Sequence, residues 1–501
     1  MSLRWRGNFI GGRFVRPAAG LSMVSEDPGD LDRPLGTVRA SVGAVDEAVA
    51  AAARAQPGWA ATPVARRRAV LARWQRVLRR RAATLVTLIA REVGKPRWEA
   101  QREVDRFIAR VDETSTMAWP RVRPYGVPVA SGVRGRCEYR PRGVLAILGP
   151  FNFPAHIPGS QFLPGLLAGN TVVFKPSELT PFVGQFLAEC AVAAEMPAGV
   201  FNLVQGAGAV GSRLVRHPAV RGVLFTGSSA VGEQIRRAVL DQPEKCVALE
   251  MGGKNAAILL DDADLRLAAR EIAVSAFSMA GQRCNATSRV ILHRRVAKPF
   301  LELFLRLVGQ LAIGYPLDPG VFMGPLVSRA AVEKYRAAQA RARREGYAVL
   351  RPGGTASIAS RRGYYVRPSV HLCERPGPLP PSVRYRVGEI FGPDVAIYIV
   401  RSADEAVAIN NEVPYGLVTS VFTRRRATFE ALSPRLDTGL VNWNRGTIFS
   451  AGGLPFGGTK ASGNHHPAGI FMIEACVYPV AVLEDRRPAG ARDCPPGFPA
   501  R

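Results

Sequence analysis

Apolar residues recur at every third or fourth position through the first part of the chain, the period of a helix with one buried face. This pattern predicts helices at residues 45–55, 65–93 and 97–118. Gly94, Lys95 and Pro96 separate the last two, because glycine and proline interrupt a helix. The first part of the chain is therefore predicted to be helical.

From Gly143 onward, short apolar runs rich in β-branched residues alternate with helical stretches. A first set places strands at 144–148, 171–174, 200–204 and 223–225, and helices at 161–168, 181–194, 212–216 and 231–240. A second set places strands at 256–260 and 290–293, and helices at 265–280 and 297–311. Strands alternating with helices at this spacing predict an α/β fold, with parallel sheets covered by helices on both faces.

Other segments stand outside this alternation. Residues 121–142 form two extended halves around Ala130-Ser131-Gly132 and predict a β-hairpin, and residues 476–483 predict another strand. Two stretches rich in Gly, Pro and Ser, 352–363 and 375–382, are predicted loops. The Arg- and Pro-rich residues 484–501 lack patterning, and we expect a flexible tail.

The chain is long and strongly basic. Its 501 residues exceed one ordinary core, so we expect two or three domains. The net charge is +27, but only seven of the 67 basic residues are lysines, and the arginines are scattered rather than gathered in tracts. That distribution argues against a dedicated nucleic-acid role and favours a compositional bias of the source.

Cysteine usage and hydropathy narrow the class further. The seven cysteines are dispersed and lack CxxC spacing, which argues against a disulfide scaffold or a zinc site, and no His/Asp/Glu cluster suggests another metal. The first residues lack the apolar core of a signal peptide, and no 18-residue apolar run follows. The sequence therefore predicts a soluble, cytoplasmic protein without metal or membrane partners.

Three short motifs bring together the groups of a carbonyl-attacking enzyme. Asn152 lies in Gly-Pro-Phe-Asn-Phe-Pro, Glu250 in Leu-Glu-Met-Gly-Gly-Lys and Cys284 in Gly-Gln-Arg-Cys. They supply an amide donor, a carboxylate base and a thiol nucleophile, and the adjacent Arg283 is expected to lower the thiol pKa. Taken singly, each has a structural alternative: a turn-capping amide, a solvated carboxylate and a buried cysteine.

Two glycine-containing turns suggest a nucleotide site. Residues 206–211 match GxGxxG between a predicted strand and helix, although a glycine turn for close packing explains them equally well. Residues 225–232 form a second strand-to-helix turn, whose amides and hydroxyl suit a pyrophosphate. Upstream, Lys175 suits a phosphate or a ribose hydroxyl. Glu178 favours a free ribose 2′-hydroxyl and repels a 2′-phosphate, so NAD is expected rather than NADP.

In this order the motifs resemble those of the aldehyde dehydrogenase superfamily, over about residues 8–482. Glu389-Ile390-Phe391-Gly392-Pro393 and residues 455–458 also carry the resemblance. It implies Cys284 as the nucleophile, Glu250 as the general base and Asn152 as an oxyanion donor. It further implies a set of NAD-binding residues: Lys175, Ser177, Glu178, Gly211, Gly227, Ser228, Ser229, Ala230, Val231, Gly232, Met251, Gly252, Glu389 and Phe391.

The resemblance also implies three domains and a homodimer or homotetramer. We expect a Rossmann-like NAD-binding domain (1–120 and 143–250), an α/β catalytic domain (251–455) and a small β oligomerisation domain (121–142 and 456–490). Residues 491–501 are expected to be a flexible tail. In this superfamily the extended segments of the small domain cross to a partner subunit.

Within the superfamily, the details look most like the N-succinylglutamate 5-semialdehyde dehydrogenases of arginine catabolism, which form glutamate and succinate. Residues 149–156, 442–444, 461–465 and 478–480 carry that similarity, whereas Lys254 and residues 285–288 depart from it. The implied reaction is NAD-dependent oxidation of an acidic semialdehyde to the carboxylate, through a thiohemiacetal and a thioester on Cys284. A dehydrogenase of another specificity and a non-catalytic, nucleic-acid-associated protein are the alternatives.

An acidic substrate calls for positive groups at the mouth of the site. Arg283 beside the nucleophile, Arg445 and His465 are the candidates, and Arg102 and Arg106 on the predicted helix 97–118 lie further afield. With so many arginines, some will lie near any opening without binding a substrate.

Overall fold

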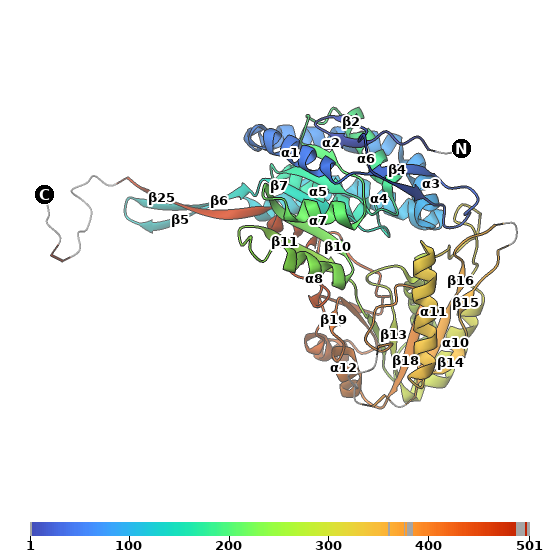
Figure 1. Cartoon of the computed structure of the whole chain (residues 1–501). Helices are drawn as coiled ribbons and strands as arrows, with labels where there is room; N and C mark the ends of the chain where they lie inside the picture. Colours follow the sequence, from blue (N-terminus) through green and yellow to red (C-terminus); the bar gives the residue numbers. More distant parts are fainter. Residues whose placement is uncertain (1–2, 359–360, 375, 378–383, 487–495, 498–501) are drawn as a thin grey trace.

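The structure is a computed structural model that describes residues 3–358, 361–374, 376–377, 384–486 and 496–497. Within these residues two seven-stranded sheets form the cores of a first and a second lobe, and a three-stranded sheet projects away from the first lobe (Figure 1). The predicted α/β fold class is confirmed, because both large sheets are mainly parallel and carry helices.

The sheet of the first lobe is parallel through five strands and ends in two antiparallel ones. Its strands, in spatial order, are β11 (Cys246–Met251), β10 (Val220–Gly227), β7 (Val144–Leu148), β8 (Thr171–Lys175), β9 (Phe201–Leu203), β1 (Asn8–Ile10) and β2 (Arg13–Val15). Every residue of β7 and β8 is buried, as expected of apolar runs in a parallel sheet. Strands β1 and β2 were not predicted, because they are too short to show a periodic pattern.

Helices cover both faces of this sheet (Figure 1). They are α1 (Gly43–Ala61), α2 (Val64–Arg80), α3 (Ala82–Val93), α4 (Arg97–Glu113), α5 (His156–Leu167), α6 (Pro181–Ala193), α7 (Gly208–Arg216) and α8 (Ser229–Ala238). The single helix predicted at 65–93 is wrong: Arg81, with φ −102° and ψ 10°, leaves the helical region and separates α2 from α3. The helix predicted at 97–118 is α4 continued by a π-helical turn, Thr114–Ala118, and a 3₁₀ turn, Trp119–Val122.

The sheet of the second lobe is parallel except for its first strand. Its strands, in spatial order, are β14 (Ala348–Arg351), β17 (Ser369–Cys373), β18 (Asp394–Val400), β13 (Arg289–His293), β12 (Ala256–Leu259), β20 (Val418–Phe422) and β21 (Leu440–Trp443). Its helices are α9 (Leu265–Phe277), α10 (Ala297–Gly309), α11 (Arg329–Arg344), α12 (Ala403–Asn411) and α13 (Arg426–Leu432). No prediction covered α11, although the side chain of Ser328 caps it by accepting a hydrogen bond from the N–H of Ala331 at 3.3 Å.

The projecting sheet confirms the predicted hairpin and the predicted C-terminal strand. Strand β5 (Tyr125–Ala130) pairs antiparallel with β6 (Val133–Pro141), and β25 (Val477–Asp485) pairs with β6 along its whole length. All six residues of β5 are exposed. Smaller elements complete the chain: β3 (Leu21–Ser25), β4 (Gly36–Ala40), β15 (Gly354–Thr355), β16 (Val366–Arg367), β19 (Tyr415–Gly416), β22 (Pro455–Phe456), β23 (Thr459–Lys460), β24 (Ala468–Gly469) and α14 (Met472–Ala475).

Three predicted irregular segments fall partly outside the described residues, and in the loop at 352–363 these are residues 359 and 360. Of the loop at 375–382 only residues 376 and 377 are described, and of the tail at 484–501 only 484–486 and 496–497. Glu484 and Asp485 belong to β25 rather than to the tail. In the part of the chain that is described, no helix has the length and apolar character needed to cross a membrane.

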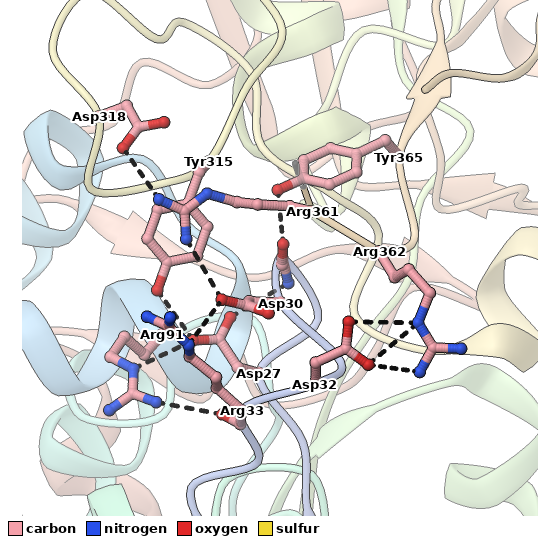
Figure 2. Close-up of polar contacts among 11 residues, drawn as sticks. Asp27, Asp30, Asp32, Arg33, Arg91, Tyr315, Asp318, Arg361, Arg362 and Tyr365 are labelled. Atoms are coloured by element: carbon pink, nitrogen blue, oxygen red, sulfur yellow. Dashed lines mark hydrogen bonds and ion pairs between the residues drawn. The ribbon is translucent and has the colours of Figure 1, made fainter. Parts of the chain in front are cut away.

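Acidic residues between β3 and β4 tie the two lobes together (Figure 2). Buried Asp27 accepts hydrogen bonds from Arg91 of α3 at 3.0 Å and from the hydroxyl of Tyr315 at 2.9 Å. Arg361 pairs with Asp30 at 3.3 Å. Because these partners come from both lobes, the segment holds them in one arrangement around the space between the sheets.

Candidate active site

Cys284 lies on a tight turn that the sequence after α9 makes possible. Met279 and Ala280 both have φ +52°, and Gly281 follows with φ +69° against the Gly392 carbonyl, where a Cβ would not fit. The side chain of Asn255 donates to the carbonyls of Cys284 at 2.8 Å and Ala286 at 2.9 Å. The backbone that carries the thiol is therefore held by close packing at Gly281 before it and by the hydrogen bonds of Asn255 after it.

Asn152 lies beside this turn and is almost fully buried. Its Nδ2 donates to the carbonyl of Gln282 at 2.9 Å, and its Oδ1 accepts from the N–H of Phe153 at 3.1 Å. An amide nitrogen carries two donors. One N–H of Asn152 is thus used to fix the side chain on the Cys284 loop, which leaves the other N–H available to a ligand.

Glu250 lies one residue before the end of β11, and a distant segment covers this end of the strand. The N–H of Met251 donates to the carbonyl of Ser462 at 2.8 Å, and the N–H of Asn464 donates to the carbonyl of Leu249 at 3.1 Å. Glu250 is 2% exposed, so the alternative of a solvated carboxylate is wrong. Neither carboxylate oxygen has a hydrogen-bond partner among the residues that the structure describes, and burial raises the pKa of Glu250 well above its ordinary value.

The thiol of Cys284 differs from the prediction. Burial raises its pKa, and the nearby carboxylates of Glu250 and Glu389 raise it further, whereas Arg283 lowers it by less. The charge of Arg283 is compensated because its guanidinium is ion-paired with buried Glu99. The expectation that Arg283 produces a low-pKa thiol is therefore corrected.

A cavity of about 850 Å³ extends from the carboxyl ends of β8 and β10 to Asn152 and Cys284. Most of the predicted cofactor residues line it: Lys175, Ser177, Glu178, Gly211, Gly227, Ser228, Val231, Met251, Gly252, Glu389 and Phe391. The edge of a parallel sheet where the strands end is where ligands bind in such folds. Both glycine-containing turns contribute, through Gly211 and Gly227.

Three of the predicted cofactor residues are not in the lining. Ser229 donates its hydroxyl to the carbonyl of Ala461 at 2.9 Å, and Ala230 is exposed. Gly232 packs against the sulfur of Met251, where a Cβ would not fit. Only Gly232 therefore serves the packing of α8 on β11, and Ser229 instead links α8 to Ala461.

The cavity end near Cys284 is shaped by Glu389 and Phe391. Glu389 Oε1 accepts from the N–H of Gly253 at 3.1 Å, and Gly252 has no room for a Cβ against that carboxylate. Phe391, with φ +59°, meets the ring of Phe151 edge to face at 5.8 Å. Two rings and one acceptor therefore stand next to the thiol.

These groups fit a nicotinamide dinucleotide. Helix α8 begins at the cavity, and its N-cap Ser228 accepts from the N–H of Val231 at 3.3 Å, so its N-terminus favours a phosphate. Glu178 is half exposed and pairs with Lys175 at 3.6 Å, which leaves carboxylate acceptors for ribose hydroxyls. The cavity therefore has the carboxylates of Glu178 and Glu389 as hydrogen-bond acceptors and the N-terminus of α8 for the phosphates. A dinucleotide needs acceptors for its two riboses and a phosphate site between them.

Sequence reasoning missed several lining residues. Lys334, from α11, lines the cavity and lowers the pKa of Glu389, which burial raises. Arg216 and Arg237, from the ends of α7 and α8, line it as well. The Ser328 cap and the amphipathic period of α11 were the available signal for Lys334. No local signal marks the two arginines.

The predicted substrate residues are spread out. Arg283 pairs with Glu99, Arg445 stacks on Phe449 at 4.1 Å, and His465 is exposed with φ +58°. None of these three is part of the cavity lining. The two more distant candidates are also engaged: Arg102 lies over the ring of Trp98 at 4.9 Å, and Arg106 donates to the carbonyl of Ser450 at 3.0 Å.

A family model, curated relatives and solved structures all relate this chain to aldehyde dehydrogenases. The family model described as "Aldehyde dehydrogenase family" matches residues 16–482. An N-succinylglutamate 5-semialdehyde dehydrogenase of Caulobacter vibrioides is 39% identical over 89% of this chain and 92% of its own length. One of Burkholderia mallei is 36% identical over 98% and 99%.

Solved structures of similar fold include an aldehyde dehydrogenase. An NAD-dependent aldehyde dehydrogenase from Sinorhizobium meliloti superimposes with a TM-score of 0.91 at 30% identity, covering 98% of this chain and 96% of that one. An NADP-dependent enzyme of E. coli gives 0.90 at 31% identity, covering 96% and 98%. The family model spans most of the chain and the relatives exceed 30% identity over nearly all of it, so this chain belongs to the aldehyde dehydrogenase family and is an enzyme of that type.

Proposed function

We propose that this enzyme oxidises N-succinyl-L-glutamate 5-semialdehyde to the carboxylate with NAD. The names of the relatives support the substrate. The observation that carries the chemistry is one cavity lined by both Asn152 and Cys284, with the carboxylate of Glu250 near enough that its charge raises the pKa of the Cys284 thiol. The experiment that tests the proposal is turnover of this semialdehyde with NAD.

Acylation uses the Cys284 loop. The thiol loses its proton and adds to the aldehyde carbon, and the oxyanion is held by the free N–H of Asn152 and the backbone N–H of Cys284. One such donor contributes about 3–4 kcal/mol to lowering the barrier. A bound nicotinamide dinucleotide supplies the hydride acceptor when the thiohemiacetal is oxidised. Glu389 and the two phenylalanine rings orient that end of the cavity.

Deacylation uses Glu250. A water attacks the thioester while the carboxylate takes its proton, and the thiolate of Cys284 leaves. Such general-base assistance contributes about 100- to 10,000-fold. Because Glu250 has no hydrogen-bond partner within the described residues, its oxygens are available to a water. This favours hydrolysis over transfer of the acyl group to a second thiol.

NAD should be preferred over NADP. The carboxylate of Glu178 repels a 2′-phosphate, and two such charges about 4 Å apart repel by about 4 kcal/mol at a surface-like dielectric. We expect kcat/KM at least about tenfold higher for NAD, and Glu178→Gln should narrow this preference for NAD, whereas Glu47→Gln, exposed on α1 and outside the cavity lining, should not. Arg216 and Arg237, which also line the cavity, attract a 2′-phosphate and so favour NADP. A parent enzyme that prefers NADP would show that Glu178 does not face the ribose.

The enzyme should be a homo-oligomer that pairs through the small domain expected from the sequence. The projecting sheet has β5 and β25 at its edges, and Tyr125, Val127 and Val129 expose apolar surface on β5. Such edges are covered when subunits pair. We expect a dimer or tetramer in sedimentation velocity at micromolar concentration. Val127→Lys should shift it toward monomer, and Val24→Lys, exposed on β3, should not. A parent protein that sediments as a monomer contradicts this assembly.

Acidic aldehydes should be the better substrates. We expect a higher kcat/KM for N-succinylglutamate 5-semialdehyde than for glutamate semialdehyde, succinate semialdehyde or neutral aliphatic aldehydes. Arg445→Ala should lower kcat/KM for the acidic substrate by several-fold to a few hundred-fold, about 1–3 kcal/mol, and leave neutral aldehydes unchanged. Arg54→Ala, exposed on α1, is the matched control. Better turnover of neutral aldehydes would overturn the substrate but not the family.

A further inference from the structure

Two glutamates of α4 point into the buried space between the loops of Asn152 and Cys284. Glu99 and Glu103 are one helical turn apart, and each is 2% exposed. Neither belongs to the chemistry proposed above. Their contacts extend in opposite directions, one to each loop.

Glu103 holds the loop of Asn152. Its Oε1 accepts hydrogen bonds from the N–H groups of Ala155 at 3.0 Å and His156 at 3.2 Å, at the start of α5. Its Oε2 pairs with Lys95 at 2.5 Å, and both side chains are fully buried. A carboxylate at a helix N-terminus satisfies otherwise unpaired donors. The end of the Asn152 loop is thereby anchored to α4.

Glu99 holds the loop of Cys284. Its Oε2 accepts from the N–H of Met279 at 2.6 Å, which fixes the residue where the left-handed turn begins. Its other oxygen is ion-paired with Arg283. Glu99 therefore contacts both ends of residues 279–283, the five residues that precede Cys284.

The ring of Phe153 links the two halves. Lys95 Nζ lies 3.9 Å from the ring centroid, and the guanidinium carbon of Arg283 lies 5.3 Å from it. Phe153 follows Asn152 directly, so the ring ties the oxyanion donor to the cation next to the nucleophile. Cations near an aromatic face are attracted to it, most strongly where water is excluded.

Stability alone gives no reason for this arrangement. Two buried ion pairs often contribute less than apolar side chains of the same volume, because desolvation of the charges offsets their attraction. Placement does give a reason: a displacement of about 1 Å between reacting groups can lower a rate by about 100-fold. The network is neutral overall, with two carboxylates and two cations.

We propose that Glu99 and Glu103 are positioning residues that hold the Asn152 loop against the Cys284 loop, with Arg283 serving as the ion partner of Glu99 rather than as a substrate-binding residue. This rests on the proposed roles of Asn152 and Cys284. It goes beyond them because it attributes the relative position of the Asn152 and Cys284 loops to a buried ion-pair network on α4.

Glu99→Gln provides the first test. Glutamine keeps an acceptor for the Met279 N–H but leaves Arg283 unpaired. We expect single-turnover NADH formation to fall by about 10- to 100-fold with the KM for the aldehyde changed less than threefold. Alkylation of Cys284 by iodoacetamide should become faster at pH 7, because the freed guanidinium favours the thiolate against Glu250 and Glu389. The alkylation rate is therefore measured against pH: a loosened structure alone would raise it at every pH, whereas the freed guanidinium shifts the rise in rate to lower pH.

Arg283→Gln should have the opposite effect on the thiol. It should lower turnover as well but slow alkylation, and Arg283→Lys should restore part of both. If Glu99 acts through Arg283, the loss in the Glu99→Gln/Arg283→Gln double variant should be smaller than the two single losses combined. Asp105→Asn, on the exposed face of α4, is the matched control and should change neither readout.

Three results would overturn the proposal. One is unchanged single-turnover rates in folded Glu99→Gln, and another is strict additivity of the double variant. The third is a raised KM confined to acidic aldehydes in Arg283→Gln, which would return Arg283 to substrate binding. If Glu99→Gln does not fold, the two Arg283 variants carry the test. The alkylation assay needs no aldehyde, so failure of the proposed substrate would leave this test intact.

Discussion

Replacing Cys284 with alanine should abolish aldehyde oxidation, with kcat lowered by about 10⁴-fold or more. Loss of a nucleophile removes the covalent step through which both halves of the reaction pass. NAD binding should persist, because Cys284 stands at one end of a cavity whose other contacts are unchanged. Both are measured on one preparation, by NADH absorbance and by titration of NAD against protein fluorescence.

Cys246→Ala is the matched control for the thiol. Cys246 begins β11, the same strand that carries Glu250, but it lies outside the cavity lining. Its replacement should leave kcat within about twofold. Retention of even a tenth of the parental activity by Cys284→Ala would remove Cys284 from the role of nucleophile.

Glu250→Gln should separate the two halves of the reaction. Thioester hydrolysis should slow by about 100- to 10,000-fold, since the amide cannot take a proton from water. Acylation needs no base at this position, so one equivalent of NADH should form in a burst, and the acyl group should remain on Cys284. Mass spectrometry of the quenched protein measures the adduct. Full steady-state turnover without an adduct would exclude Glu250 as the base.

The pH dependence of deacylation gives a second reading of Glu250. Burial raises its pKa well above the ordinary value, so the basic form accumulates only as the pH rises. Deacylation by the parent enzyme should therefore increase with pH beyond the range where an ordinary carboxyl has already ionised. The Gln variant should lack that increase. A parental rate that is flat from pH 5 upward would contradict a buried, protonated Glu250.

The linear sequence was sufficient for the fold class, and it supplied the hypothesis for the three chemical groups. Alternating apolar runs and helical stretches are local patterns, and strands such as Val144–Leu148 and Thr171–Lys175 lie where those patterns placed them. Motifs around Asn152, Glu250 and Cys284 are also local, and they are recognisable without knowing their neighbours in space. Their resemblance to the motifs of aldehyde dehydrogenases pointed to the family, which the family model confirmed.

Contacts between distant segments were decided only by the tertiary structure. Glu250 is buried because residues 462–464, more than 200 positions away, cover the strand that carries it. Arg283 was expected to activate the thiol, but α4 brings Glu99 to it and compensates its charge. Such effects depend on which side chains pack against one another, so they have no signature along the chain. Charge compensation and desolvation are properties of a neighbourhood, and the neighbourhood exists only once the two lobes and α4 have packed together.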